Sequence, residues 1–363
     1  MNRIGEILGK AAEGAFLSRE EAIRIYLHAG DGELMETADR IRWNLHPEPR
    51  VSWIIDRNVN ITNVCVSFCK FCNFCRRSSD EDAYVTTLEQ YRQKIQELFS
   101  LGGRQLLLQG GMHPDLGLDF YTGLFRKLKE EFPELRLHAL GPPEIVHLVR
   151  LEQTDYLTVL NELRTAGLDS LPGAGAEILV DRVRRIVSRG KCTADEWIEV
   201  MRTAHRIQLP TSATMMFGHA ETMEERVDHI LRIRTLQAEK PENSMGFLNF
   251  VPWPFQDQGT VLRNEMGIRS SVDARQYIRL LALSRILLPN ISHIQASWLT
   301  VGKAAGQICL HAGADDFGSI MIEENVVSAA GSKHVMNAGI MEEAIREAGF
   351  IPQLRNQLFE PIG

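Results

Sequence analysis

The chain has 363 residues, 44% of them hydrophobic, and its 47 acidic and 40 basic residues give a formal net charge of −7. Its apolar runs are too short to cross a bilayer and its basic residues form no polybasic block, which argues against membrane and nucleic-acid partners. The first residues carry no signal-peptide pattern, and three of the six cysteines share one loop, as expected in a reducing compartment. We therefore expect a soluble, cytoplasmic protein with one large core or two modest ones.

Residues 1–50 are predicted to be helical. Ser18 and Glu21 stand at capping-box spacing, and an apolar face follows between Ala22 and Leu27. Such a stripe usually packs on a larger domain. We therefore interpret residues 1–50 as an N-terminal helical extension that covers the main domain.

From residue 51 onward, short apolar runs alternate with amphipathic helical patterns. This alternation predicts an α/β fold with one (β/α)8 TIM-type barrel over residues 51–330. Residues 331–363 are predicted to add a C-terminal helix near 342–348 and a polar tail, both packed on the barrel. The eight candidate strands are 51–59, 105–109, 135–140, 168–171, 212–217, 247–251, 293–296 and 307–311.

Three cysteines follow the first predicted strand, and Cys65, Cys69 and Cys72 have C-x3-C-x2-C spacing. Cysteine thiolates are the usual ligands of iron–sulfur clusters, and three of them hold three irons of a four-iron cluster. The fourth iron then remains open to another ligand. Because active sites of this barrel lie in the loops after the strands, the cysteine loop falls where the fold places chemistry. We predict a [4Fe–4S] cluster with these three cysteines as metal ligands.

Cys72 and Cys75 also have the C-x2-C spacing of a zinc knuckle. A structural zinc site needs a second pair of ligands, and the remaining cysteines, Cys192 and Cys309, are isolated. A zinc-stabilised binding module is therefore the non-enzyme alternative, and the cluster is the preferred interpretation. We interpret Cys75 as a spectator beside it.

With an aromatic residue just before its third cysteine, the loop resembles the cluster loop of the radical S-adenosylmethionine (SAM) superfamily. The resemblance implies that the open iron binds SAM, and that an electron from the cluster cleaves SAM to a 5′-deoxyadenosyl radical. The SAM-binding residues that the resemblance favours are Phe71, Gln109, Gly110, Gly111, Met216 and Gly218. Local explanations stay open, because a Gly-Gly turn is common after a strand and Met216 suits a core position.

Further polar residues follow the third, fourth and eighth strands. Glu177 lies in a loop of small residues, and its carboxylate is suited to accept hydrogen bonds from the ribose hydroxyls of SAM. His138 and Glu144 are candidates for a catalytic base and its partner, although Glu144 also suits the first turn of a helix for local reasons. Asp315 and Asp316 are either loop caps or contacts to sugar hydroxyls.

From about Asn60 to Val327, the markers together resemble one radical SAM subgroup: the futalosine-pathway enzymes of menaquinone biosynthesis and the deazaflavin-precursor synthases. The chain is most similar to the cyclase branch, the cyclic dehypoxanthinyl futalosine synthases. Trp253 and Gln256 stand where the aminofutalosine synthases tend to have Leu and His, whereas Cys75 departs from the Tyr usual in cyclases. The markers outside the cysteine loop are 109–114, 142–145, 173–179, 217–219 and 313–325.

The resemblance implies a reaction and its partners. The radical would abstract the ribose C4′ hydrogen of dehypoxanthine futalosine, and the resulting carbon radical would close onto the attached benzoate ring. One electron and one proton then leave, with His138 or Glu144 as the base. The implied electron donor is a flavodoxin or ferredoxin. Aminofutalosine synthase and deazaflavin-precursor synthase are the alternatives within the subgroup.

Overall fold

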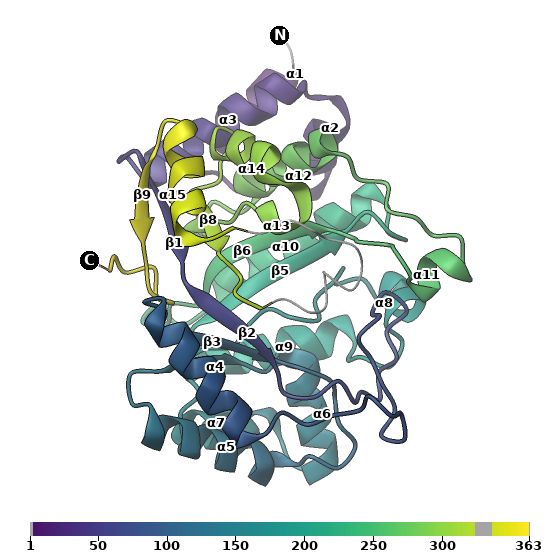
Figure 1. Cartoon of the computed structure of the whole chain (residues 1–363). Coiled ribbons are helices and arrows are strands. Elements are labelled where there is room, and N and C mark those ends of the chain that lie inside the picture. Colours follow the sequence, from purple (N-terminus) through teal and green to yellow (C-terminus); the bar gives the residue numbers. More distant parts are fainter. Residues whose placement is uncertain (1–2, 324–335, 363) are drawn as a thin grey trace.

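The computed structural model describes residues 3–323 and 336–362, so the markers Glu324 and Asn325 lie outside the described residues. The chain begins with three helices, α1 (Arg3–Ala12), α2 (Arg19–His28) and α3 (Asp31–Leu45). Ser18 caps α2 through the predicted reciprocal hydrogen bonds with Glu21. These helices pack on later helices, with α2 against α10 (Met223–Glu239) and α3 against α12 (Ala274–Leu287) (Figure 1).

The strands form three parallel sheets of three strands each. The first has the order β8 (Asp316–Ser319), β1 (Arg50–Ile54), β9 (Ile351–Leu354). The second has the order β2 (Asp56–Asn60), β3 (Gln105–Gln109), β4 (Arg136–Ala139). The third has the order β5 (Thr211–Phe217), β6 (Phe247–Pro254), β7 (His293–Ile294).

Helices surround these sheets in a TIM-like barrel arrangement, with α4 beside β2, α14 beside β8 and α12 beside β6 and β7 (Figure 1). Thr87 and Thr193 cap α4 and α9 with capping boxes. The outer helices are α4 (Leu88–Ser100), α5 (Leu118–Glu131), α6 (Pro142–Glu152), α7 (Tyr156–Ala166), α8 (Asp181–Val187), α9 (Ala194–Arg206), α10 (Met223–Glu239), α11 (Val261–Asn264), α13 (Trp298–Val301), α14 (Lys303–Leu310) and α15 (Ala338–Glu347).

The strand register determines which residues of β2 and β3 lie at the same height in the interior. Asp56 pairs with Gln105, Asn58 with Leu107, and Asn60 with Gln109. Because alternate residues of a strand point to the same side, the polar residues of β2 and β3 face the interior together. The interior is therefore polar at several levels.

The structure corrects three sequence predictions. Residues 307–311 were predicted to form a strand, but residues 307–310 belong to α14 and His311 is its C-cap, and β8 is the last barrel strand instead. A short apolar run cannot be assigned to strand or helix by periodicity alone. Residues 168–171 form only isolated bridges, and the predicted polar tail contains β9, which pairs with β1.

No helix in the described ranges combines the length and apolar character that a membrane crossing requires.

Candidate active site

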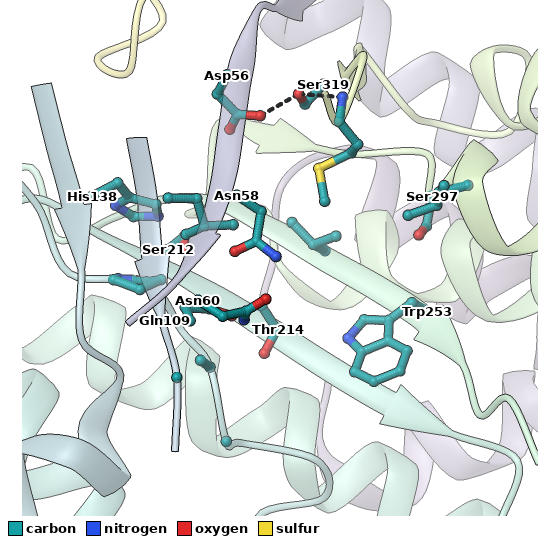
Figure 2. A pocket seen from close by; sticks show the side chains of 18 of the residues that line it. Asp56, Asn58, Asn60, Gln109, His138, Ser212, Thr214, Trp253, Ser297 and Ser319 are labelled. Carbon is teal, nitrogen blue, oxygen red and sulfur yellow. Dashed lines mark hydrogen bonds between the residues drawn. The ribbon is translucent and has the colours of Figure 1, made fainter. Parts of the chain in front are cut away.

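A cavity of about 380 Å³ runs through the interior of the strands. Cys65 and Gly111 line one end, beyond the carboxyl ends of β2 and β3. Gln357 and Phe359, from the segment after β9, line it at the other end. Figure 2 shows polar side chains of several strands pointing into this space. The predicted cysteine loop and the predicted polar loops therefore open into one cavity.

The cysteine loop is fixed by backbone hydrogen bonds to neighbouring segments. The Cys65 N–H donates to the Arg76 carbonyl (3.0 Å), and the Lys70 N–H donates to the Val187 carbonyl (2.9 Å). The thiols of Cys65, Cys69 and Cys72 all line the cavity. Three convergent thiols are a suitable donor set for a [4Fe–4S] cluster.

Cys75 also lines the cavity and interacts with Cys65. A hydrogen bond from the Cys75 thiol stabilises the Cys65 thiolate and lowers the pKa of Cys65 to about 6, while the same bond raises the pKa of Cys75. The Cys75 Sγ also lies 3.4 Å from the Cys65 carbonyl oxygen. Cys75 is thus a direct neighbour of a predicted ligand.

Gly110 and Gly111 line the cavity, and Gly111 is required by packing. A Cβ atom at Gly111 would lie 2.0 Å from the Val64 carbonyl oxygen, and one at Gly110 would lie 3.0 Å from the Thr62 carbonyl oxygen. The Gly111 N–H donates to the Thr62 carbonyl at 2.8 Å. The glycine pair lets β3 approach the cysteine loop closely, which places Gln109 and the loop side by side.

Glu177 and Lys191 form a buried ion pair beside the cysteines. The Lys191 ammonium donates to Glu177 Oε1 at 2.8 Å and lies 5.2 Å from the centre of the Phe71 ring. Glu177 Oε2 accepts no hydrogen bond within the described residues, although Arg184 Nη1 is 3.6 Å away. A buried acceptor without a partner is suited to a ligand hydroxyl, as predicted for a ribose.

Sequence reasoning missed Lys191. Burial lowers the pKa of this ammonium, but the neighbouring Cys69, Glu177 and Glu144 outweigh burial and raise it. The charged form therefore persists among the cysteines. Lys191 lies 14 residues after Glu177, at no motif spacing, so only folding brings them together.

His138 and Glu144 line the same cavity at different depths. His138 lies on β4 inside the barrel, where its Nδ1 is 2.7 Å from Ser170 Oγ and 3.2 Å from Gln357 Nε2. Burial lowers the pKa of His138 to about 3. Glu144 lies in the first turn of α6, and burial raises the pKa of its carboxyl to about 7.

Met216 and Gly218 stand beside the cavity rather than in its wall. The buried Met216 donates its N–H to the Glu177 carbonyl at 3.1 Å, which ties β5 to the Glu177 loop. Gly218 has φ +91, and a Cβ atom there would lie 2.2 Å from Val272 Cγ2. Local packing accounts for both residues, and their predicted contact with SAM stays a prediction.

The two aspartates near β8 are not sugar contacts. Asp315 is paired with Arg285 (2.5 Å), and Asp316 is paired with Arg355 (2.6 Å). Both carboxylates lie at the start of β8, away from the cysteine loop, and neither lines the cavity. The sugar-contact alternative is therefore wrong for these residues.

Comparison with known proteins identifies the family. Residues 59–233 match the model described as the radical SAM superfamily, and residues 244–362 match the CofH/MqnC C-terminal region. The chain is 40% identical to cyclic dehypoxanthine futalosine synthase of Halalkalibacterium halodurans, over 99% of this chain and 95% of that protein. The chain belongs to the radical SAM superfamily.

Other proteins align with the chain over most of their length. The protein of the same name from Streptomyces coelicolor is 39% identical, over 98% of this chain and 88% of that protein. Aminodeoxyfutalosine synthase of Thermus thermophilus is 36% identical, over 99% and 96%. The crystal structure of methylornithine synthase matches with a TM-score of 0.73 at 17% identity, over 95% of this chain and 97% of that one, and shows the fold alone.

Radical SAM enzymes use a [4Fe–4S] cluster and SAM. The cavity residues fit both groups: three thiols converge in the cysteine loop, and Glu177 keeps a buried acceptor free of hydrogen bonds nearby. The chain is therefore an enzyme that depends on these two cofactors.

Proposed function

We propose that this radical SAM enzyme is a cyclic dehypoxanthine futalosine synthase that closes dehypoxanthine futalosine onto its benzoate ring in a futalosine route to menaquinone. The observation that carries the proposal is the end-to-end match, at 40% identity, to a relative of that name. Trp253, the residue that favours the cyclase branch in the sequence, lines the cavity, which supports a contact with substrate.

We assign the cofactor positions from the cavity wall. Cys65, Cys69 and Cys72 would hold three irons, and Gln109 with Gly110 and Gly111 would border SAM. Phe71 and Glu177 would border it on the other side, with Glu177 Oε2 accepting from a ribose hydroxyl. When bound, the cluster and SAM supply a radical that takes a hydrogen atom from the substrate.

The protein's own contribution is geometry and proton transfer. The enclosed walls hold the sugar carbon near the aryl carbon, which replaces a search in solution by a fixed arrangement. Ring closure leaves a ring radical that must lose one electron and one proton, and the protein's residues take the proton. Glu144 is the better base of the two candidates, because its carboxyl pKa of about 7 allows it to be ionised at neutral pH.

His138 suits a donor role better. The Gln357 amide nitrogen can only donate, so His138 Nδ1 accepts and the ring proton resides on Nε2. A neutral ring with Nε2–H in the cavity donates to substrate and has no free lone pair there. We therefore propose Glu144 as the base and His138 as a hydrogen-bond donor.

We also infer that the three sheets belong to one (β/α)8 barrel spanning residues 51–330, with 1–50 and 331–363 as flanking segments. Isolated bridges support this, since His138 pairs with Ser170, Leu171 with Thr211, and Gln295 with Asp316. The Ile320 N–H donates to the Ile54 carbonyl, and the Ile322 N–H donates to the Asp56 carbonyl at 3.4 Å, so the chain after β8 continues alongside β1 toward β2.

For the electron donor we propose a flavodoxin or ferredoxin. Phe68 of the cysteine loop is 53% exposed, and the Arg77 guanidinium lies 5.8 Å from its ring centre. An exposed apolar side chain next to a cation suits a small acidic partner.

The experiment is product analysis with the anaerobically reconstituted chain, SAM, dithionite and dehypoxanthine futalosine. The expected result is cyclised product with one 5′-deoxyadenosine released per product. In a parallel reaction, the enol-ether substrate of aminofutalosine synthase should give no adduct. An adduct there, with no cyclised product, would instead assign the sister activity.

A further inference from the structure

The cavity wall below the cysteine loop is chemically divided. We propose that its polar side, centred on Asn58, binds the ribose hydroxyls of the substrate and thereby sets which sugar carbon faces the cluster end. The proposal rests on the proposed function for the identity of the substrate. Within that function it makes Asn58 a positioning residue and assigns an orientation to the ligand.

The polar part of the wall consists of neutral groups from β2, β5, β6 and the segment after β7. We call it the amide wall: Asn58, Ser212, Thr214, Asn249 and Gln295. Asn58 and Thr214 come from β2 and β5 and point into the same space in Figure 2. Amides and hydroxyls both donate and accept, which is the pattern that sugar hydroxyls require.

Two buried amide oxygens in this region have no hydrogen-bond donor among the described residues. Asn58 is 4% exposed, and its Oδ1 has no hydrogen-bond partner among the described residues. Gln105 donates its Nε2 to Asp56 Oδ2 (3.2 Å), which leaves its Oε1 equally unpaired. Buried acceptors are almost always paired in native proteins, so a bound donor is expected here. A ribose offers several hydroxyl donors at once.

The charged groups in this part of the cavity already have partners within the chain. Arg355 is held by Asp316, with Nε 2.6 Å from Oδ2 and Nη2 3.1 Å from Oδ1. Asp56 accepts from Ser319 Oγ and from Gln105. The amide wall therefore presents neutral hydrogen-bonding groups, which match a sugar better than the benzoate carboxylate.

Across the cavity from Asn58, the strands that carry Thr214 and Asn249 become apolar toward the carboxyl end of β6. Val251 and Trp253 of β6 line it, together with Leu299 and Met321. Figure 2 shows the Trp253 indole on the far side of the space from Asn58. An aromatic face of this kind is suited to the benzoate ring, so the two halves of the substrate have separate walls.

Strand geometry places the sugar within reach of the cluster end. Asn58 precedes Asn60 by two residues on β2, which corresponds to about 7 Å along the strand. Asn60 is followed directly by the loop that carries Cys65. A ribose held at Asn58 thus lies one level below the cofactor end, between it and the floor formed by Gln357.

The test compares binding of dehypoxanthine futalosine with binding of analogues that each lack one ribose hydroxyl. The reconstituted full chain with SAM and no reductant is used, so binding is measured without turnover. We expect the wild-type chain to bind the parent about tenfold more tightly than at least one analogue. In Asn58→Ala this ratio should fall to about one. With reductant, the variant should release more than one 5′-deoxyadenosine per product.

Asn58→Leu, which keeps the number and branching of the side-chain heavy atoms, should behave as Asn58→Ala does, and thermal unfolding checks that both variants fold. The matched control is Asn290→Ala. Asn290 Oδ1 is also buried and unpaired, but Asn290 does not line the cavity, so the tenfold ratio should survive.

The results distinguish failure of the amide-wall proposal from failure of the proposed function. If wild type binds the parent and the folded Asn58 variants keep its discrimination, or if wild type discriminates against none of the analogues, the amide-wall proposal alone is wrong. If wild type neither binds nor converts dehypoxanthine futalosine, the proposed function is wrong and this proposal falls with it.

Discussion

Both ends of the barrel strands contain buried ionisable side chains, but the two ends differ in how completely these side chains are paired. At the start of β8, Asp315 is paired with Arg285 at 2.5 Å and with His293 at 2.5 Å. At the cysteine end, one oxygen of Glu177 accepts no hydrogen bond from the residues that the structure describes, and Cys65 is held toward its thiolate form. The first arrangement is complete within the chain, whereas the second is completed by ligands.

Fully paired buried charges stabilise the fold, whereas buried groups without a partner are available to bind ligands. A buried charge with fixed partners cannot lose one of them without a large cost. A buried acceptor without a partner lowers stability until a ligand arrives, and it can then select that ligand. In barrels of this type the loops after the strands carry function and the opposite end carries stability, and the charges follow the same division. The predictions below test it from both ends.

The largest effect is expected at the cluster. Cys69→Ala removes one of three iron ligands, so SAM cleavage should fall below detection, measured as 5′-deoxyadenosine released with dithionite. Cys75→Ala should retain SAM cleavage, because Cys75 supports Cys65 without being a predicted ligand. Cys309→Ala, at a buried cysteine outside the cavity, is the matched control and should retain four irons per chain. Full activity in Cys69→Ala would overturn the ligand assignment.

At the opposite end, Asp315→Ala should cost about 3–5 kcal/mol of unfolding free energy, because it leaves the buried Arg285 without its counterion. Urea unfolding measures the change. Asp228→Ala removes a partly exposed partner of Arg19 and should cost less than about 1 kcal/mol. Equal costs for the two variants would contradict the proposed division between the ends.

Glu144→Gln should lower kcat by about 100-fold, since a positioned base contributes at least that much. With a pKa of about 7, the carboxylate fraction of Glu144 increases as the pH rises from 6 to 8, and wild-type kcat should rise with it. The variant should lose this rise. His138→Gln is the comparison, and a kcat–pH profile that keeps its rise in Glu144→Gln but loses it in His138→Gln would reverse the two roles.

The smallest effect concerns His229, which is fully buried and accepts a hydrogen bond from the Leu179 N–H. Burial lowers its pKa to about 3. Below pH 6.5, His229 is therefore protonated in the unfolded chain but stays neutral in the folded chain. Its contribution should lower the free energy of unfolding by about 1.4 kcal/mol for each pH unit below 6.5.

His229→Asn should remove that part of the slope in urea unfolding at pH 7, 6 and 5. The exposed His28 gives the matched control, and His28→Asn should keep the wild-type slope. A slope unchanged in His229→Asn would mean that this histidine takes up its proton in the folded chain as well.

Short-range patterns in the sequence predicted a large part of the secondary structure. Ser18 begins a helix as its capping pattern predicts, because a cap depends only on residues three positions apart. The strand at 105–109 agrees with its prediction to the residue. The error at 307–311 came from an apolar run whose state depends on what it packs against.

The polar interior was visible in the sequence but was not used. Asp56, Asn58 and Asn60 alternate along β2, a period of two that places them on one face of a strand. Reading this face as polar would have predicted the amide wall at Asn58. The pairing of Lys191 with Glu177 left no such trace, since neither spacing nor residue type marks it.

The sequence by itself determined the cysteine spacing, the superfamily and the alternation of strands with helices, because each is written in residues close together along the chain. Only the tertiary structure decided that Lys191 neutralises Glu177, that Gln357 closes the floor beneath His138, and that Asp315 and Asp316 serve stability. These contacts join segments far apart in the chain, and their partners become defined only when the strands bring them to one level of the barrel.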